Sequence, residues 1–279
     1  MKKILFLLAS VAMLSSCDEL TQNEDVVTTE PTPSTTELSF TSSINAVTKV
    51  TDTNFESGDV ISVTAYDASS TLIKDAAQYT HNGSLFMSDD PIIYSADDVT
   101  YSFYAVYPAV SSLQTSLDFY AEADQSADGA FTASDMLFAS IASSDSIPQL
   151  SFDHKMSSIV ISIAGDDSGS IEFYAKTGLR YGIKTGSVSA IGDSVTVIPA
   201  SNGTASCKVI LAPQAVASGT TLATYTVSGL VYDWVLDADF EMTSGKQYVF
   251  NWSLADREVT LDSVINGWDV VDGGTIESK

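Results

Sequence analysis

Apolar and polar residues alternate with a period of two along most of the chain from Leu38 onward. This period places every second side chain on one face of a β-strand, so it predicts strands whose apolar faces pack on another sheet. Residues 247–254 (QYVFNWSL) are the clearest case, because four large apolar residues share one face. The apolar positions of the predicted strands are Ile61, Val63 and Ala65; Tyr101, Phe103 and Ala105; Ile159, Ile161 and Ile163; Val209 and Leu211; Tyr248, Phe250, Trp252 and Leu254; Val259 and Leu261.

Turn signals separate these strands, namely Asn82-Gly83, Gly165-Asp166, Asn202-Gly203 and Asn266-Gly267. No window holds a helical period of useful length. Many short β-branched and aromatic strands joined by such turns are typical of β-sandwiches, so we predict an all-β chain. The serine-rich stretch 140–150 (SIASSDSIPQL) divides the strands into two groups of similar size. We therefore predict two tandem sandwiches, residues 38–149 and 150–279.

The beginning of the chain lacks this alternation. Residues 1–16 combine a basic head, an apolar run too short to cross a bilayer and small residues at the end, which predicts a signal peptide. The sequence Leu14-Ser15-Ser16-Cys17 resembles the lipobox of bacterial lipoproteins, in which the cysteine becomes the acylated (palmitate-bearing) first residue. Lipid on Cys17 would anchor the protein in the outer membrane. The alternative is a plain signal peptide followed by an incidental cysteine.

Residues 17–37 are acidic and rich in Thr and Pro, which predicts a disordered tether. The acidic residues directly behind Cys17 resemble the surface-export signal of Bacteroidetes lipoproteins. An acidic tether also simply favours solubility, so both explanations stay open at this point.

Charge and cysteine content narrow the classes of function. The chain has 36 acidic and 12 basic residues, a formal net charge of −24, so nucleic acid and anionic membrane surfaces should repel it. Once Cys17 carries lipid, Cys207 is the one remaining thiol, which excludes an intramolecular disulfide and a cysteine metal cluster. Stability must then come from packed cores.

The sequence contains few candidate catalytic residues. The two histidines, His81 and His154, adjoin neither a nucleophile motif nor a second ligand at metal spacing, so we interpret them as a turn histidine and a strand-edge histidine. Carboxylates are abundant, but the sequence selects no pair for glycosidase chemistry. We therefore predict no enzyme, no catalytic residue and no cofactor.

One acidic segment matches part of a calcium-binding pattern. Asp124, Ser126, Asp128, Gly129 and Asp135 occupy the first, third, fifth, sixth and twelfth places of an EF-hand-like loop. The twelfth residue is Asp instead of the longer, bidentate Glu, and no helices are predicted beside it. A solvated acidic loop is the favoured interpretation, so no metal site is predicted.

Three short sequences resemble the Asp-Ser/Thr-apolar sites of Bacteroidetes O-glycosylation. Their serines are Ser146, Ser194 and Ser263, each preceded by Asp. Ordinary turn-to-strand junctions produce the same triplets, so glycosylation stays an open alternative.

Several longer stretches together resemble the fimbrillin-like (Mfa-like) family of Bacteroidetes surface lipoproteins, whose members build or decorate type V pili. They are Asn54–Val63 (NFESGDVISV), Phe103–Pro108 (FYAVYP), Asp124–Ser126 (DQS) with Ser134–Ala139 (SDMLFA), Leu150–Ile159 (LSFDHKMSSI), Ser244–Tyr248 (SGKQY) and Ile265–Trp268 (INGW). In this order they cover nearly the whole mature chain.

The resemblance implies two transthyretin-like sandwiches and assembly by strand exchange. In such pilins a trypsin-like protease cuts after a basic residue beyond the first strand, and an extended strand of another subunit fills the vacated groove by β-strand addition. Leu38–Ile44 would be the removable strand here, and the cut would follow Lys49. The family favours Arg at this site, and the alternative is a solvent-facing Lys in a β-turn.

The first functional hypothesis is therefore a non-enzymatic pilus subunit or accessory protein with a role in cell adhesion. Its partners would be other fimbrillin-like subunits and a host or bacterial surface ligand. It would lie on the outer membrane, or in an extracellular pilus once it is processed. The second hypothesis is a lipid-anchored glycan-binding protein of a polysaccharide-uptake system, which needs a flat aromatic platform. Tyr232, Trp234 and Trp268 are its candidates, and they could equally be core residues.

Overall fold

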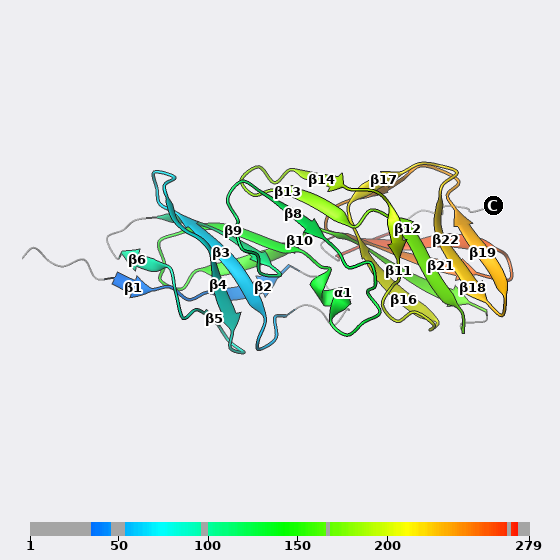
Figure 1. Cartoon of the computed structure of the whole chain (residues 1–279), viewed down its shortest axis with the longest axis horizontal. Coiled ribbons are helices and arrows are strands. Elements are labelled where there is room, and N and C mark those ends of the chain that lie inside the picture. The colour runs from blue at the N-terminus through cyan, green and yellow to red at the C-terminus, as the bar shows by residue number, and fades with distance from the viewer. Residues whose placement is uncertain (1–34, 46–53, 96–99, 166–167, 267–268, 273–279) are drawn as a thin grey trace, which may run out of the picture. The chain divides into compact units, whose positions relative to one another are not determined.

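The strand alternation leads to a structure built almost entirely from β-sheets (Figure 1). The computed structural model describes residues 35–45, 54–95, 100–165, 168–266 and 269–272. In these ranges the one helix is α1 (Ala130–Ala133), a single turn. The predicted all-β class is confirmed. No helix among these residues is long and apolar enough to span a membrane.

A seven-stranded sheet contains most strands of the first half of the chain. Its order is β2 (Thr41–Ile44), β10 (Gln149–His154), β9 (Leu137–Ser143), β7 (Tyr101–Tyr107), β3 (Val60–Tyr66), β4 (Leu72–His81) and β5 (Phe86–Met87). Neighbours are antiparallel except β2 and β10, which run parallel. The predicted apolar positions of β3 and β7 point into one core, which also contains Tyr79 and Phe152.

Two further sheets enclose the core of the second half. One has the order β16 (Ser206–Leu211), β11 (Ser157–Ala164), β21 (Lys246–Ser253), β22 (Glu258–Asn266) and β23 (Asp269–Asp272). The other has the order β15 (Val195–Val197), β12 (Ser170–Ala175), β18 (Thr221–Val227) and β19 (Leu230–Val235). Apolar residues of both sheets form one cluster, as in a β-sandwich, and Trp234 meets Phe250 with ring centroids 4.6 Å apart.

A three-stranded sheet joins strands from the two halves of the chain. It has the order β14 (Val188–Ile191), β13 (Gly178–Gly182) and β8 (Ser116–Tyr120), and a separate pair is formed by β17 (Gln214–Val216) and β20 (Phe240–Met242). A third apolar cluster contains Phe138 of β9 together with Leu179 of β13. The division at residues 149/150 stays a prediction, and β10, which begins there, pairs with β2 and β9.

A described strand lies before the predicted end of the tether at residue 37. Thr35–Glu37 forms β1, which pairs with β6 (Ile93–Ser95). The three side chains of β1 are exposed, so backbone pairing holds this strand without any apolar period. That is why the pattern of hydrophobic residues did not reveal it.

Candidate functional site

The segment Leu38–Ile44, called the N-terminal segment below, inserts its apolar side chains into the first core. Leu38 is 2% exposed and Phe40 is 0% exposed, while Ser39 between them is half-buried. The Phe40 ring lies edge-on to Tyr79 and Phe103, with centroids 4.9 and 5.4 Å away. Alternate side chains of this segment therefore fill apolar pockets in the core.

Backbone hydrogen bonds connect the N-terminal segment to β5 and β10, the two strands that would be the edges of the sheet without β2. Phe40 exchanges two bonds with Phe86 of β5, with N···O distances of 3.1 and 2.9 Å. From Thr41 onward the segment continues as β2 and pairs with β10. At its end the Asn45 amide Nδ2 donates to Asp153 Oδ1 at 2.8 Å. The segment thus passes from one edge to the other and covers both.

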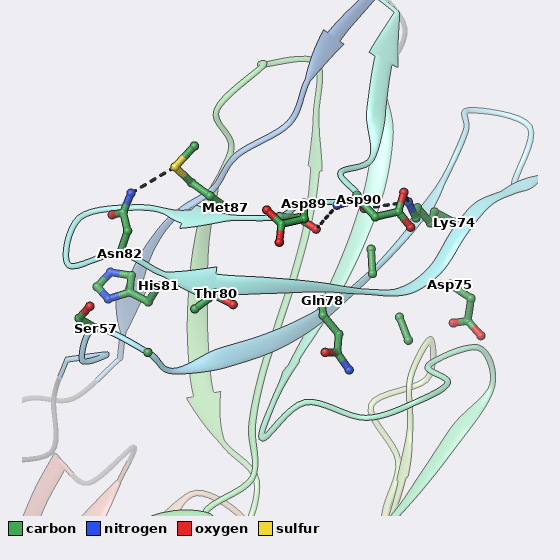
Figure 2. Close-up of a pocket in the computed structure, with 14 residues that line it drawn as sticks. Ser57, Lys74, Asp75, Gln78, Thr80, His81, Asn82, Met87, Asp89 and Asp90 are labelled. Atoms are coloured by element: carbon green, nitrogen blue, oxygen red, sulfur yellow. Dashed lines mark hydrogen bonds and ion pairs between the residues drawn. The ribbon is translucent and has the colours of Figure 1, made fainter.

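A polar groove of about 970 Å³ lies beside β4 (Figure 2). The labelled side chains include Gln78 and Thr80 of β4 and Asp89, which follows β5. At one end of the groove, Lys74 of β4 forms an ion pair with Asp90, with Nζ 2.6 Å from Oδ1. Ser57 and His81 line its other end, where Gly58 N donates to the His81 carbonyl oxygen at 2.9 Å.

Asp75, at the edge of this groove, fixes the loop that follows β7. Its Oδ1 accepts hydrogen bonds from Thr64 Oγ1 and Leu113 N, and its Oδ2 accepts from Ser112 Oγ and Gln114 Nε2, all at 2.8 to 2.9 Å. Burial of the carboxylate opposes its ionisation, but these four bonds outweigh burial and hold the pKa of Asp75 below its usual value. The sequence offered no signal for this role, because the four donors are distant along the chain.

Both histidines have structural contacts. His81 ends β4 and is buried; its Nδ1 lies 3.2 Å from the Glu56 carbonyl oxygen, and its ring packs against Phe86. The His154 side chain is 1% exposed and its Nδ1 lies 2.7 Å from Asp135 Oδ2. His154 ends β10, so the strand-edge interpretation agrees with its position, and His81 belongs to the strand just before the predicted turn.

Two carboxylates of the acidic loop, those of Asp124 and Asp135, make contacts within the protein. Asp124 Oδ1 accepts from the backbone N and the Oγ of Ser126, at 3.0 and 2.6 Å. Asp135 faces His154, and Gly129 has a φ of +76° at the start of α1. Among the residues that the structure describes, no group of three or more His, Cys, Asp or Glu is arranged to hold a metal ion.

Gln125, the middle residue of Asp124–Ser126, has a structural role that sequence reasoning missed. It is 1% exposed, its Nε2 donates to the Ile210 carbonyl oxygen at 2.7 Å, and its Oε1 accepts from Ile210 N at 2.8 Å. The amide thereby continues the hydrogen bonding of β16 into the loop. The sequence signal that could have indicated this role was the presence of the same tripeptide in the pattern of the fimbrillin-like family.

The aromatic residues expected to form a glycan platform do not share an exposed face. Trp234 is 3% exposed inside the second core, and Tyr232 packs against the same cluster. Trp268 lies outside the described residues. Trp234 is therefore a core residue.

The remaining candidate sites stay predictions. Ser146 and Ser194 are exposed in loops, and Ser263 is half-buried on β22, so glycosylation of the first two meets no steric obstacle. Cys17 and Lys49 lie outside the described residues. Cys207 is buried, and burial raises the pKa of its thiol to about 12, so it stays protonated.

The geometry defines a class of protein, a multi-sheet β-protein in which an N-terminal segment covers two sheet edges with its apolar side chains in the core. The fimbrillin-like family model matches residues 48–268. The chain therefore belongs to the fimbrillin-like family, and the predicted family is confirmed. A comparison with curated proteins gives no match.

Solved structures from Bacteroides share the fold. A candidate cell adhesion protein from Bacteroides uniformis is 20% identical, with a TM-score of 0.65 over 85% of this chain and 98% of that chain. Another, from Bacteroides ovatus, is 15% identical, with a TM-score of 0.63 over 88% of this chain and 98% of that chain. At these identities the likeness shows the fold alone.

Proposed function

We propose that this protein is a non-enzymatic, surface-exposed lipoprotein that serves as a subunit or accessory of a pilus and takes part in cell adhesion. Membership of the fimbrillin-like family supports a structural, adhesive role at the cell surface. Lipid on Cys17 would hold the precursor in the outer membrane.

Protease-triggered strand exchange is the proposed mechanism of assembly. Hydrolysis of the peptide bond after Lys49 separates the N-terminal segment from the rest of the chain. The segment then leaves, and an extended strand of another subunit occupies its place, with backbone bonds giving affinity and alternate side chains giving register. The supporting observation is the combination of buried Leu38 and Phe40 with pairing to β5 and β10.

The decisive experiment is the N-terminal residue and the intact mass of the protein recovered from the surface of its own cells. A start at Val50 without lipid is the expected result for a polymerising subunit. A start at acylated Cys17 would exclude polymerisation of this chain by this route and leave a lipid-anchored accessory subunit. An unacylated N-terminus before Lys49 would contradict the proposal that the protein is a lipoprotein.

Two variants sharpen this measurement. Lys49→Gln removes the positive charge that a trypsin-like protease requires, so it should block both processing and polymer formation. Lys49→Arg keeps the charge and is the matched control, which should be processed at least as well as the natural chain. Equal processing of all three proteins would exclude Lys49 as the cleavage site.

A further inference from the structure

A hollow of about 380 Å³ opens between the first sheet and the turn that follows β13. Ser102 and Tyr104 of β7 and Ser140 of β9 line it from the sheet, and Tyr181, Lys184 and Thr185 line it from β13 and its turn. Tyr104 and Ser140 are direct cross-strand partners, and the small serines leave room beside the tyrosine ring. The volume is near the lower end of the roughly 300–1,000 Å³ found for small-molecule pockets.

The charge of this hollow differs from that of two other concave sites. Its lining includes Lys184 and no carboxylate. The groove of Figure 2 is lined by Asp75, Asp89 and Asp90, and a cavity of about 160 Å³ near Ile44 is lined by Glu56, Asp59 and Asp135. In a chain with three acidic residues for each basic one, a hollow lined without any carboxylate favours an anionic ligand.

Lys184 is held in place without an ion pair. Its Nζ lies 3.7 Å from the centre of the Tyr66 ring, a cation–π contact, and no carboxylate in the described part of the chain forms a salt bridge with it. Tyr66 is itself fixed by an edge-on contact with Tyr104, with centroids 5.9 Å apart. Tyr66 does not line the hollow, but Lys184 does and is exposed, so its ammonium can reach a ligand bound there.

Hydroxyl groups and aromatic rings surround the same space. Tyr181 is 5% exposed and its ring packs on Phe138, and burial, together with the nearby Asp153 charge, raises the pKa of the Tyr181 hydroxyl to about 12. Tyr181 is therefore a neutral donor at physiological pH. Rings that contact C–H groups, hydroxyls that exchange hydrogen bonds and a cation that binds a carboxylate together match the chemistry of an acidic sugar.

We propose that this hollow binds a uronic-acid type sugar unit of a surface glycan, with Lys184 on the carboxylate, the Tyr104 ring against the sugar and Tyr181 at the edge of the site. The inference rests on the proposed adhesion role and names the ligand class for it. It requires neither cleavage after Lys49 nor strand exchange.

The test is calorimetric titration of the full chain with a short glucuronic-acid oligosaccharide and with the neutral glucose oligosaccharide of the same length and linkage. We expect the acidic probe to bind more tightly. Lys184→Gln should weaken its binding about tenfold, the effect of losing one hydrogen bond to a charged group. Ser140→Phe fills the hollow and should abolish binding. Lys176→Gln makes the same charge change outside the hollow and should bind as the natural chain does.

Absence of binding to the acidic probe by the folded natural chain would overturn the inference, as would equal weakening by Lys184→Gln and Lys176→Gln. If melting curves show that Ser140→Phe is unfolded, the binding measured for Lys184→Gln alone tests whether the hollow is the site. Cleavage is scored separately on cells. A protein that is processed at Lys49 but binds no sugar contradicts this site only, and a protein that binds the sugar but is never processed contradicts strand exchange only.

Discussion

The N-terminal segment and β21 have the same alternating pattern in sequence but different positions in their sheets. β21 is a central strand, paired in parallel with β11 and antiparallel with β22 along its length. The β2 part of the N-terminal segment pairs with β10 alone, over four residues. Both bury aromatic rings completely or nearly so, Phe40 in one case and Trp252 in the other.

The comparison shows that a strand can bury its side chains and still be removed without separating the other strands of its sheet. Removal of β21 would divide the five-stranded sheet, whereas removal of the N-terminal segment would leave the other six strands of its sheet paired as they are. An edge strand with buried side chains can be exchanged for another strand of matching side chains, because its backbone partners stay in place. The predictions below test this distinction, from the largest expected effect to the smallest.

Deletion of residues 18–45 should lower the free energy of unfolding of the first half by about 5 kcal/mol, since Leu38 and Phe40 each lose burial worth roughly 1.5–3 kcal/mol. Denaturant unfolding measures the loss, and amide hydrogen exchange locates it in β5 and β10. A synthetic peptide of residues 36–45 should restore protection in trans, and the same peptide with Phe40→Ala should not. Full protection without the segment would contradict its role in covering the core.

Truncation of one ring in each region should cost a similar amount in the intact chain. We expect Phe40→Ala and Trp252→Ala each to lower the free energy of unfolding by about 3–5 kcal/mol because each leaves a cavity. Ser39→Ala, beside Phe40, should change it by less than about 0.5 kcal/mol. After cleavage at position 49 and loss of the segment, Phe40→Ala should have no effect while Trp252→Ala keeps its full cost. An unchanged Phe40→Ala effect would show that the segment stays bound.

Asp75→Ala should lower the free energy of unfolding by about 2 kcal/mol at neutral pH, because four donors lose an ionised acceptor. The pKa of Asp75 is lowered in the folded state, so its stabilising effect is complete above an unfolded pKa of about 3.9 and is lost as the pH falls through the folded value. Denaturant unfolding of both proteins should therefore give a difference that shrinks below about pH 4. A difference independent of pH would exclude the ionised carboxylate as the cause.

The alternation of apolar and polar residues predicted the strands well, because the side chains that a strand buries are every second residue of a short continuous segment. The apolar positions of β3, β7, β11 and β21 all face cores as expected, and the Asn82-Gly83 turn forms, with Gly83 at a φ of +98°. β1 escaped prediction because only its backbone is paired.

Features that depend on distant residues could not be predicted. The parallel pairing of β2 with β10, the contact of β8 with β13 and the donors around Asp75 each join parts of the chain with no shared local signal. Trp234 illustrates the limit for the candidate sites. An aromatic residue in an alternating strand suits a core and a binding platform equally, and only the neighbouring sheet assigns it to the core.

The pairing of β2 with β10 also has a consequence for synthesis. Ser43 and Ser151, which meet across this pair, are 108 residues apart, so β2 has no paired strand until β10 has also left the ribosome. Contacts at such separation form late and slow folding. During synthesis β2 therefore stays unpaired until β10 has been made, and the open sheet edge that we propose for assembly has a counterpart in the biogenesis of each new molecule.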